Sequence, residues 1–209
     1  MQRKPESLNN ISGSSILYLL LTAVAWENFL FAIVAAIFVC RDFENETINM
    51  TFTYGYSKIK VLLSKFLVYL VGSAAILYIF IFSSTIIFSI LYGFEKDLNI
   101  YFILTILKSI LVNMLGITAI SSITFLISIL TRNSVLTIIS PFFILFVAIC
   151  ISNFNNPIIS NLLPFNLVIN AIINHVKFID LFKLLILCLL TIIFCIYVSN
   201  LHLKRIEFK

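Results

Sequence analysis

The chain has 209 residues, of which 61% are hydrophobic and only 11% are charged, and its formal net charge is +5. A soluble domain of this size needs a charged surface that this composition does not supply, so a soluble globular protein is excluded. The basic residues lie beside apolar runs rather than on a polar face, which indicates membrane topology and not nucleic-acid binding.

Five apolar runs predict an all-α integral membrane protein, a five-helix bundle that forms one transmembrane domain over residues 1–209. The runs cover residues 16–40, 61–92, 100–130, 134–152 and 181–201. Each is close to or above the ~20 residues that a helix needs to cross a bilayer. The first run is about twice too long for a secretory signal, and Pro141 is expected to kink the fourth helix.

Two of the polar segments between these runs are long. Residues 41–60 predict a cytoplasmic coupling segment between the first two helices. Residues 153–180 contain Pro157, Pro164 and repeated Asn, and are too polar to span a membrane yet too apolar for a free linker. We expect them to form short external interfacial helices at the lipid surface.

The distribution of cations predicts the orientation. An odd number of crossings places the termini on opposite sides, and one side then holds Arg41, Lys58, Lys60, Lys65, Arg132, Lys204, Arg205 and Lys209. The other side holds Arg3, Lys4, Lys96, Lys177 and Lys183. The side richer in cations should be cytoplasmic, so the N terminus is expected outside and the C terminus inside. The richness in Ile, Phe, Asn and Lys is typical of an AT-rich bacterial genome, and we expect a bacterial cell membrane.

Three polar residues lie within the predicted transmembrane helices: Glu27, Lys108 and Asn113. An ionisable side chain inside a bilayer is costly and is a candidate for function. Glu27 can alternatively belong, with Trp26 and Asn28, to a polar interfacial belt. Lys108 lies at a similar predicted depth, so the two can neutralise each other between helices; the alternative is that Lys108 snorkels outward on its own.

Catalytic motifs are absent from the sequence. There is no GxxxxGK[ST] phosphate loop, no HExxH and no GxSxG, and the two His residues have no partner at catalytic or metal-ligand spacing. The four cysteines show no CxxC spacing and lie in or beside apolar runs. The sequence therefore predicts no catalytic, cofactor or metal site, and an intramembrane enzyme is the least favoured class.

The segment from Arg41 to Lys65, RDFENETINMTFTYGYSKIKVLLSK, carries the most specific pattern. Its apolar residues alternate between Ile48 and Tyr56, which taken literally favours a strand, but an isolated strand would leave its backbone unpaired. As a helix, Ile48, Phe52 and Tyr56 share one face. Gly55 would end this helix, and Ser57 would cap the next one.

At these residues the chain resembles the permease subunits of bacterial ABC-2 type exporters, especially small ones linked to lantibiotic or bacteriocin self-immunity. The match consists of Asp42, Thr47-Ile48, Gly55-Tyr56-Ser57-Lys58 and Ser64-Lys65. The departures are Glu46 where Gly is usual, Asn49 where a cation is usual, and Lys58 in place of Arg. The family usually has six spanning helices, so the resemblance implies a late start or a shortened variant that lacks the first.

The resemblance implies that the coupling segment docks on a separate ATPase subunit, which binds the ATP, and that two permease copies or paralogues pair in the bilayer. The docking candidates are Asp42, Glu46, Thr47, Ile48, Phe52, Gly55, Ser57, Lys58, Lys60 and Lys65. The alternative is an ordinary solvated loop whose cations only fix topology. The expected function is ATP-driven export of a hydrophobic or amphipathic substrate, such as a peptide, drug or lipid-like molecule; the alternative is a truncated permease-like anchor or regulator.

Overall fold

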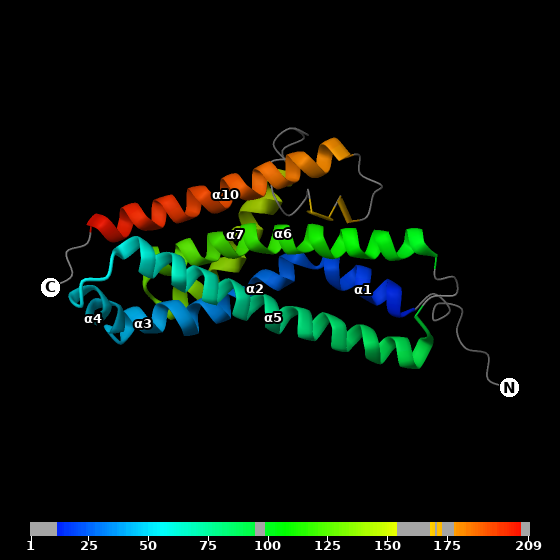
Figure 1. Ribbon diagram of the computed structural model, residues 1–209, viewed down its shortest axis with the longest axis horizontal. Coiled ribbons are helices and arrows are strands. Elements are labelled where there is room, and N and C mark those ends of the chain that lie inside the picture. The colour runs from blue at the N-terminus through cyan, green and yellow to red at the C-terminus, as the bar shows by residue number, and fades with distance from the viewer. Residues whose placement is uncertain (1–11, 95–98, 154–167, 170, 173–177, 206–209) are drawn as a thin grey trace.

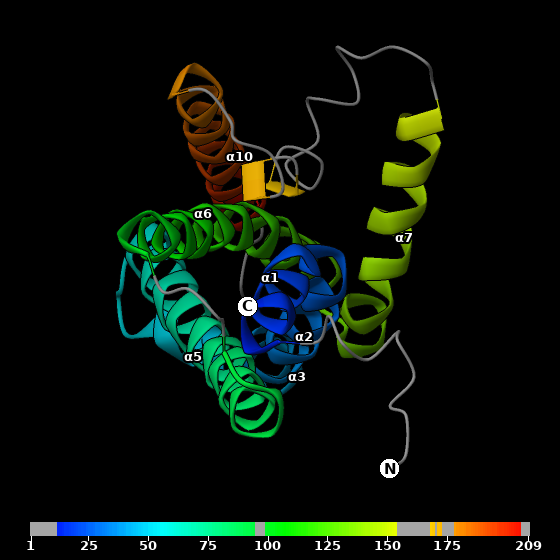
Figure 2. The same ribbon diagram turned by 90° about the vertical axis from the view of Figure 1, so that its right-hand side faces the viewer.

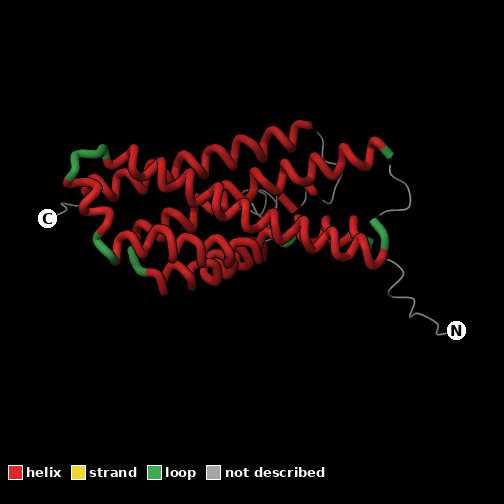
Figure 3. The backbone as a smooth tube through the Cα atoms, turned by 60° about the horizontal axis from the view of Figure 1, so that its bottom comes forward, coloured by secondary structure: helices red, strands yellow, loops and turns green. Residues whose placement is uncertain are grey.

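The computed structural model describes residues 12–94, 99–153, 168–169, 171–172 and 178–205, and within these residues every regular element is a helix (Figure 3). The all-helical prediction is therefore confirmed. The predicted external segment 153–180 falls mostly outside the described residues. The elements are α1 (Gly13–Thr22), α2 (Val24–Ala35), the π-helix η2 (Ala36–Cys40), α3 (Arg41–Glu44), α4 (Thr47–Thr53), α5 (Lys58–Tyr92), α6 (Ile100–Thr131), α7 (Ser134–Asn153) and α10 (Phe178–Arg205).

Among the described residues, three helices are long and apolar enough to cross a membrane: α5, α6 and the Leu181–Lys204 part of α10. The bent pair formed by α1 and the Trp26–Glu44 stretch would make a fourth crossing if it is one span. The apolar part of α7, Ser134–Cys150, is shorter. Five crossings are therefore not confirmed, although the predicted bounds of the second, third and fourth runs agree with α5, α6 and α7 to within three residues.

Helix α6 lies at the centre of the bundle and contacts α1, α2, α5, α7 and α10 (Figure 2). One reason is its run of small and polar buried residues, which lets other helices approach closely. These include Ser109, Gly116, Ala119, Ser121, Ser122 and Ser128. Larger aromatic side chains fill the spaces beside them: the Tyr69 ring lies 5.7 Å from the Phe125 ring and 6.5 Å from the Phe31 ring.

The first apolar run is not the continuous helix that the sequence predicts. Helix α1 ends at Thr22, α2 begins at Val24, and the two parts of the run meet at an angle of 61°. The backbone N–H of Ala23 donates to Leu20 O at 3.0 Å, a tighter turn than an α-helix makes. The carbonyl of Leu21 instead accepts a 2.8 Å hydrogen bond from the Asn113 side chain. A side chain of α6 thus replaces the backbone donor that the break removes.

Helix α7 continues past Pro141, whose ring nitrogen cannot donate to the preceding turn. The hydroxyl of Ser140 donates to Thr137 O at 2.7 Å, so the carbonyl that Pro141 leaves free is still paired. The kink expected at Pro141 stays a prediction.

The two ends of the bundle gather different segments (Figure 1). At one end, the start of α1 is bonded to the turn after α5, with Gly13 N–H donating to Gly93 O at 2.9 Å and Ser14 N–H to Phe94 O at 3.2 Å. Residues 41–58, the α6–α7 link and the end of α10 lie at the other end. The described segments that the cation count assigned to one predicted side therefore meet at one end.

Gly116 offers a direct test of the α6 packing. A Cβ atom at this position would lie 2.4 Å from Val168 Cγ2 and 3.3 Å from Val168 Cβ, whereas a Cβ at Gly72 would meet nothing within 4 Å. We predict that Gly116→Ala lowers the free energy of unfolding by about 1–3 kcal/mol, as overpacking does. The control Gly72→Ala should cause no loss, because Ala is the better helix former.

Thermal unfolding in detergent measures both variants. Equal stability of Gly116→Ala and Gly72→Ala would contradict the close packing of Val168 on α6.

Candidate functional site

Helix α4 lies against the bundle through its apolar face. Ile48 is 3% exposed, and Ile48 and Phe52 line a contact region with α5, α6 and α10 that encloses only about 10 Å³ of free space. The helical interpretation of this segment is therefore confirmed over Thr47–Thr53, and the strand alternative is wrong. Ile48 anchors α4 to its own chain and is not available to a partner.

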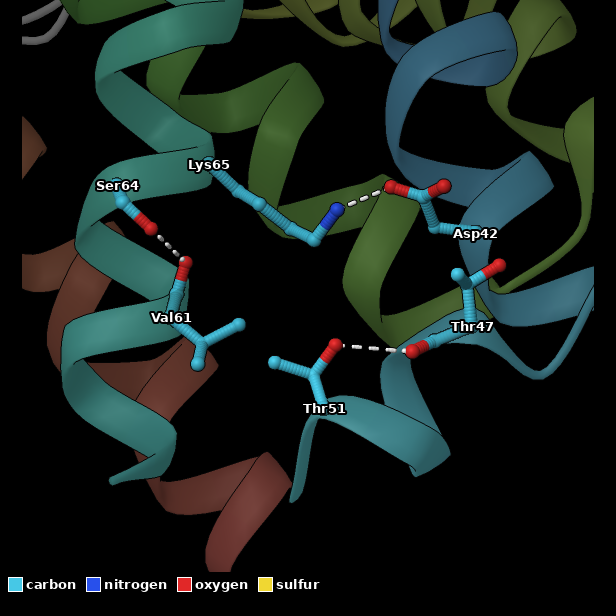
Figure 4. A network of polar contacts seen from close by, with 6 residues as sticks. All are labelled: Asp42, Thr47, Thr51, Val61, Ser64 and Lys65. Carbon is cyan, nitrogen blue, oxygen red and sulfur yellow. Dashed lines mark hydrogen bonds and ion pairs between the residues drawn. The ribbon is translucent and has the colours of Figure 1, made fainter. Parts of the chain in front are cut away.

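An ion pair joins the start of the coupling segment to α5. Lys65 Nζ on α5 pairs with Asp42 Oδ2 on α3, and both side chains are partly shielded from solvent (Figure 4). The Lys65 ammonium also lies 5.3 Å from the centroid of the Phe38 ring, at cation–π distance. The structure thus brings together two of the predicted docking residues, but it pairs them with each other.

Three further contacts tie the coupling segment to the rest of this end. The backbone N–H of Ser134, at the start of α7, donates to Glu44 Oε1 at 3.0 Å. The Arg132 guanidinium lies 5.3 Å from the Phe43 ring, and Lys58 Nζ donates to Leu203 O at 2.9 Å. Glu44 and Arg132 were not predicted as site residues. The only sequence signal for their contacts was that the coupling segment and the α6–α7 link were assigned to the same predicted side.

The outward surface of the coupling segment is aromatic and cationic. Tyr54 is 81% exposed and Tyr56 is 63% exposed, while Met50 and Lys60 are also exposed. We call these four residues the docking surface. The sequence predicted that Tyr56 shares a face with Ile48 and Phe52, and this prediction is wrong. The chain leaves the helix at Gly55, whose φ is +85°. Ser57 holds the cap position of α5 with extended backbone, but its side chain makes no cap hydrogen bond.

The π-helix η2 joins the first helix to the coupling segment. Its last residue, Cys40, is buried, and its sulfur lies 3.1 Å from Thr137 Oγ1 and 3.6 Å from Ser128 O. The wide turn of a π-helix is frequent at functional sites and has no reliable sequence signal. Cys40 is one of four free cysteines.

A second polar cluster lies inside the bundle, beside the break between α1 and α2. The Tyr78 hydroxyl on α5 donates to Asn113 Oδ1 at 3.1 Å, and Asn113 Nδ2 lies 3.4 Å from both carboxylate oxygens of Glu27. Tyr78, Asn113 and Glu27 are called the interior cluster below. Two of the three predicted intramembrane polar residues therefore meet, and Tyr78 joins them.

Lys108 does not pair with Glu27, so that hypothesis is wrong. Asn113 is the side chain that contacts the Glu27 carboxylate, and Lys108 instead lines a separate pocket between α6 and α10 with Leu181 and Leu184. Lys108 and Asn113 are five residues apart, which places them about 140° apart around α6, so only one of them faces the first helix.

The sequence of residues 3–208 matches a family described as proteins of unknown function, DUF2705. The chain belongs to the DUF2705 family. No curated protein and no solved structure matches this DUF2705 chain. Over the residues that the structure describes, no three His, Cys, Asp or Glu side chains gather as metal ligands would.

Glu46 of this DUF2705 protein adopts the left-handed conformation, with φ +57° and ψ +10°, directly before α4. An L-residue in this conformation costs roughly 1–2 kcal/mol, whereas Gly adopts it freely. Glu46 is also the position at which the resembled permeases usually carry Gly. The turn between α3 and α4 thus explains why Gly would suit this position.

We predict that Glu46→Gly raises the free energy of unfolding by about 0.5–1 kcal/mol, because relief of backbone strain exceeds the entropy that Gly loses on folding. Glu46→Ala keeps the β-carbon and should give no gain. Gly55→Ala, at φ +85°, should lower stability. Thermal unfolding of the three variants measures these effects, and a gain for Glu46→Ala equal to that for Glu46→Gly would exclude backbone strain as the cause.

Proposed function

We propose that this DUF2705 protein is the transmembrane permease subunit of an ATP-driven ABC-2 type exporter. It would move a hydrophobic or amphipathic substrate out of the cell or membrane, together with a separate ATPase subunit that binds and hydrolyses the ATP. The observation that carries the proposal concerns the coupling segment: α4 is anchored on the bundle by Ile48, and Tyr54 and Tyr56, which follow α4, are exposed.

This geometry suits a motor contact better than a solvated loop. A loop that only fixes topology needs no buried anchor and no contacts to other helices, yet the coupling segment is joined to α5, α7 and α10. Exposed tyrosines beside a cation have the composition of a protein interface. A force applied to α4 would therefore reach three helices through the contacts of the coupling segment to which α4 belongs.

The proposal includes five crossings. Helices α5, α6 and α10 would each span the bilayer, the bent α1–α2–η2 unit would be the fourth crossing, and α7 would be the fifth. The coupling segment, the α6–α7 link and the end of α10 lie at one end of the bundle, which we assign to the cytoplasm because of its cations. The N terminus would then lie outside.

In the proposed arrangement, the interior cluster would lie within the hydrocarbon core of the bilayer. Helix α6 is about 48 Å long at 1.5 Å per residue, and Asn113 lies about 20 Å from its start. A hydrocarbon core that is ~30 Å thick includes Asn113, whichever part of α6 lies inside the core. The interpretation of Glu27 as part of an interfacial belt is therefore disfavoured. A single subunit would supply half of a pathway, so a second copy or a paralogue completes the proposed exporter.

Site-specific crosslinking tests the ATPase contact. A photo-reactive residue is placed at Tyr56 on the docking surface, or at Tyr101, which is 78% exposed on α6 at the opposite end. The chain is co-expressed with the ABC-type ATPases of its source bacterium. We expect a crosslink to an ATPase from Tyr56 and none from Tyr101. The double change Tyr56→Ala with Lys60→Glu should weaken the complex about tenfold, the equivalent of about 1.4 kcal/mol.

Transport separates the two functions left open by the sequence. Proteoliposomes with the chain and the crosslinked ATPase should show ATP-dependent movement of a hydrophobic substrate. Stable ATPase binding without any movement would favour the anchoring or regulatory subunit. Equal crosslinking from Tyr56 and Tyr101 would contradict the docking surface.

A further inference from the structure

A small cavity lies beside the break in the first helix. It has a volume of about 170 Å³ and is lined by α1, α2 and α5 residues that include Ala23, Trp26, Glu27, Leu77, Phe80 and Ile81. Leu77 and Ile81 are only 2% exposed and form its floor, whereas Trp26 is 74% exposed and Phe80 is 57% exposed. The cavity therefore opens sideways from the bundle, between two aromatic side chains.

The Glu27 carboxyl group is the only ionisable side chain among these lining residues, and it is 8% exposed. Its hydrogen-bond donor is Asn113 Nδ2 at 3.4 Å from each oxygen, a long contact, while the same nitrogen makes a 2.8 Å bond to Leu21 O. A carboxylate offers about four acceptor sites. Within the described part of the chain, Glu27 makes no ion pair, so a strong donor with positive charge is what this group lacks.

The other walls suit the same kind of ligand. Trp and Phe rings attract cations through their faces, and desolvation strengthens that attraction. A cation placed on Glu27 also gives a neutral pair, which costs less in apolar surroundings than a lone charge. Both the Glu27 carboxylate and the aromatic rings at the cavity opening would therefore attract a positively charged ligand.

The volume limits what can enter. An apolar cavity of about 150 Å³ holds one benzene molecule, and sites for drug-sized ligands begin at about 300 Å³. The cavity at the break thus accommodates one aromatic ring or a short alkyl chain. A folded peptide is too large.

We propose that this cavity binds a lipophilic ammonium group, a protonated amine on a single ring or short apolar chain, which enters sideways from the bilayer. The ammonium donates to the Glu27 carboxylate, and the apolar part packs on Leu77 and Ile81 between Trp26 and Phe80. As the substrate class of the exporter, this rests on the proposed function. The binding step itself does not require the ATPase.

Trp26 is the single tryptophan of the chain, so its fluorescence reports on this cavity alone. The purified full chain in lipid nanodiscs is titrated with 4-bromophenethylammonium, whose bromine quenches tryptophan, and with the matched neutral alcohol 2-(4-bromophenyl)ethanol. We expect saturable quenching by the amine. The alcohol should give only the unsaturated quenching that follows partition into lipid.

Four variants localise the effect. Glu27→Gln keeps the side-chain shape and should weaken amine binding at least tenfold. Ala23→Leu retains the carboxylate but fills the cavity, and should also weaken binding. Glu46→Gln makes the same chemical change at an exposed site on the coupling segment and should leave binding unchanged. A chain with Trp26→Phe and Phe146→Trp moves the reporter to an exposed position on α7 and should show no saturable quenching.

Equal quenching by the amine and the alcohol would overturn the proposal, as would wild-type amine affinity in Glu27→Gln or Ala23→Leu. These outcomes are independent of the docking experiment, because no ATPase is present. Loss of ATPase crosslinking with intact amine binding would refute the exporter and keep the site. The reverse result would refute the site and keep the exporter.

Discussion

The structure depends on how α6 pairs its buried polar groups. Polar groups inside an apolar bundle cost several kcal/mol if they stay unpaired, so each is stabilised by a partner in its own helix or on a neighbouring one. Asn113 donates to Leu21 O, Thr124 shares a 2.8 Å hydrogen bond with Tyr69, whose hydroxyl also contacts Phe31 O, and Ser128 O lies beside Cys40. The contacts at these three positions of α6 hold α1, α2 and η2 against it. One helix therefore determines both where the first helix breaks and where the coupling segment begins.

The same helix connects the two candidate sites. Its middle holds the interior cluster beside Glu27, and its end leads through Arg132 and Ser134 to the coupling segment. In the proposed exporter, a movement of α4 would pass through Asp42–Lys65 to α5 and through Glu44–Ser134 to α7. Helix α5 also carries Leu77 and Ile81, which form the floor of the cavity. The contacts form a continuous path of packed groups between the two candidate sites.

Much of the helical framework could be predicted from the sequence, because apolar runs with few charges leave little choice of structure. The bounds of α5 and α6, the helical nature of α4 and its end at Gly55 follow from local residues. The break at Ala23 could not be predicted, since Thr22-Ala23-Val24 contains no Gly or Pro and the missing backbone donor is replaced by Asn113, about 90 residues away in the sequence. The pairing of Glu27 with Asn113 rather than Lys108 depends on the rotation of α6. The inward position of Ile48 likewise depends on where α5 and α10 lie.

Cysteine labelling from each side of the membrane tests the central claim most directly, which is that the coupling segment lies on the cytoplasmic side of a chain that crosses the bilayer. In a background without the four native cysteines, single cysteines replace Tyr56, Asn133 and Gly93, and a membrane-impermeant maleimide is added to intact cells or to inverted vesicles. The cysteines at positions 56 and 133 should react only in inverted vesicles, and the cysteine at position 93 only in intact cells. Labelling of positions 56 and 93 from the same side would contradict the arrangement on which both proposed sites depend.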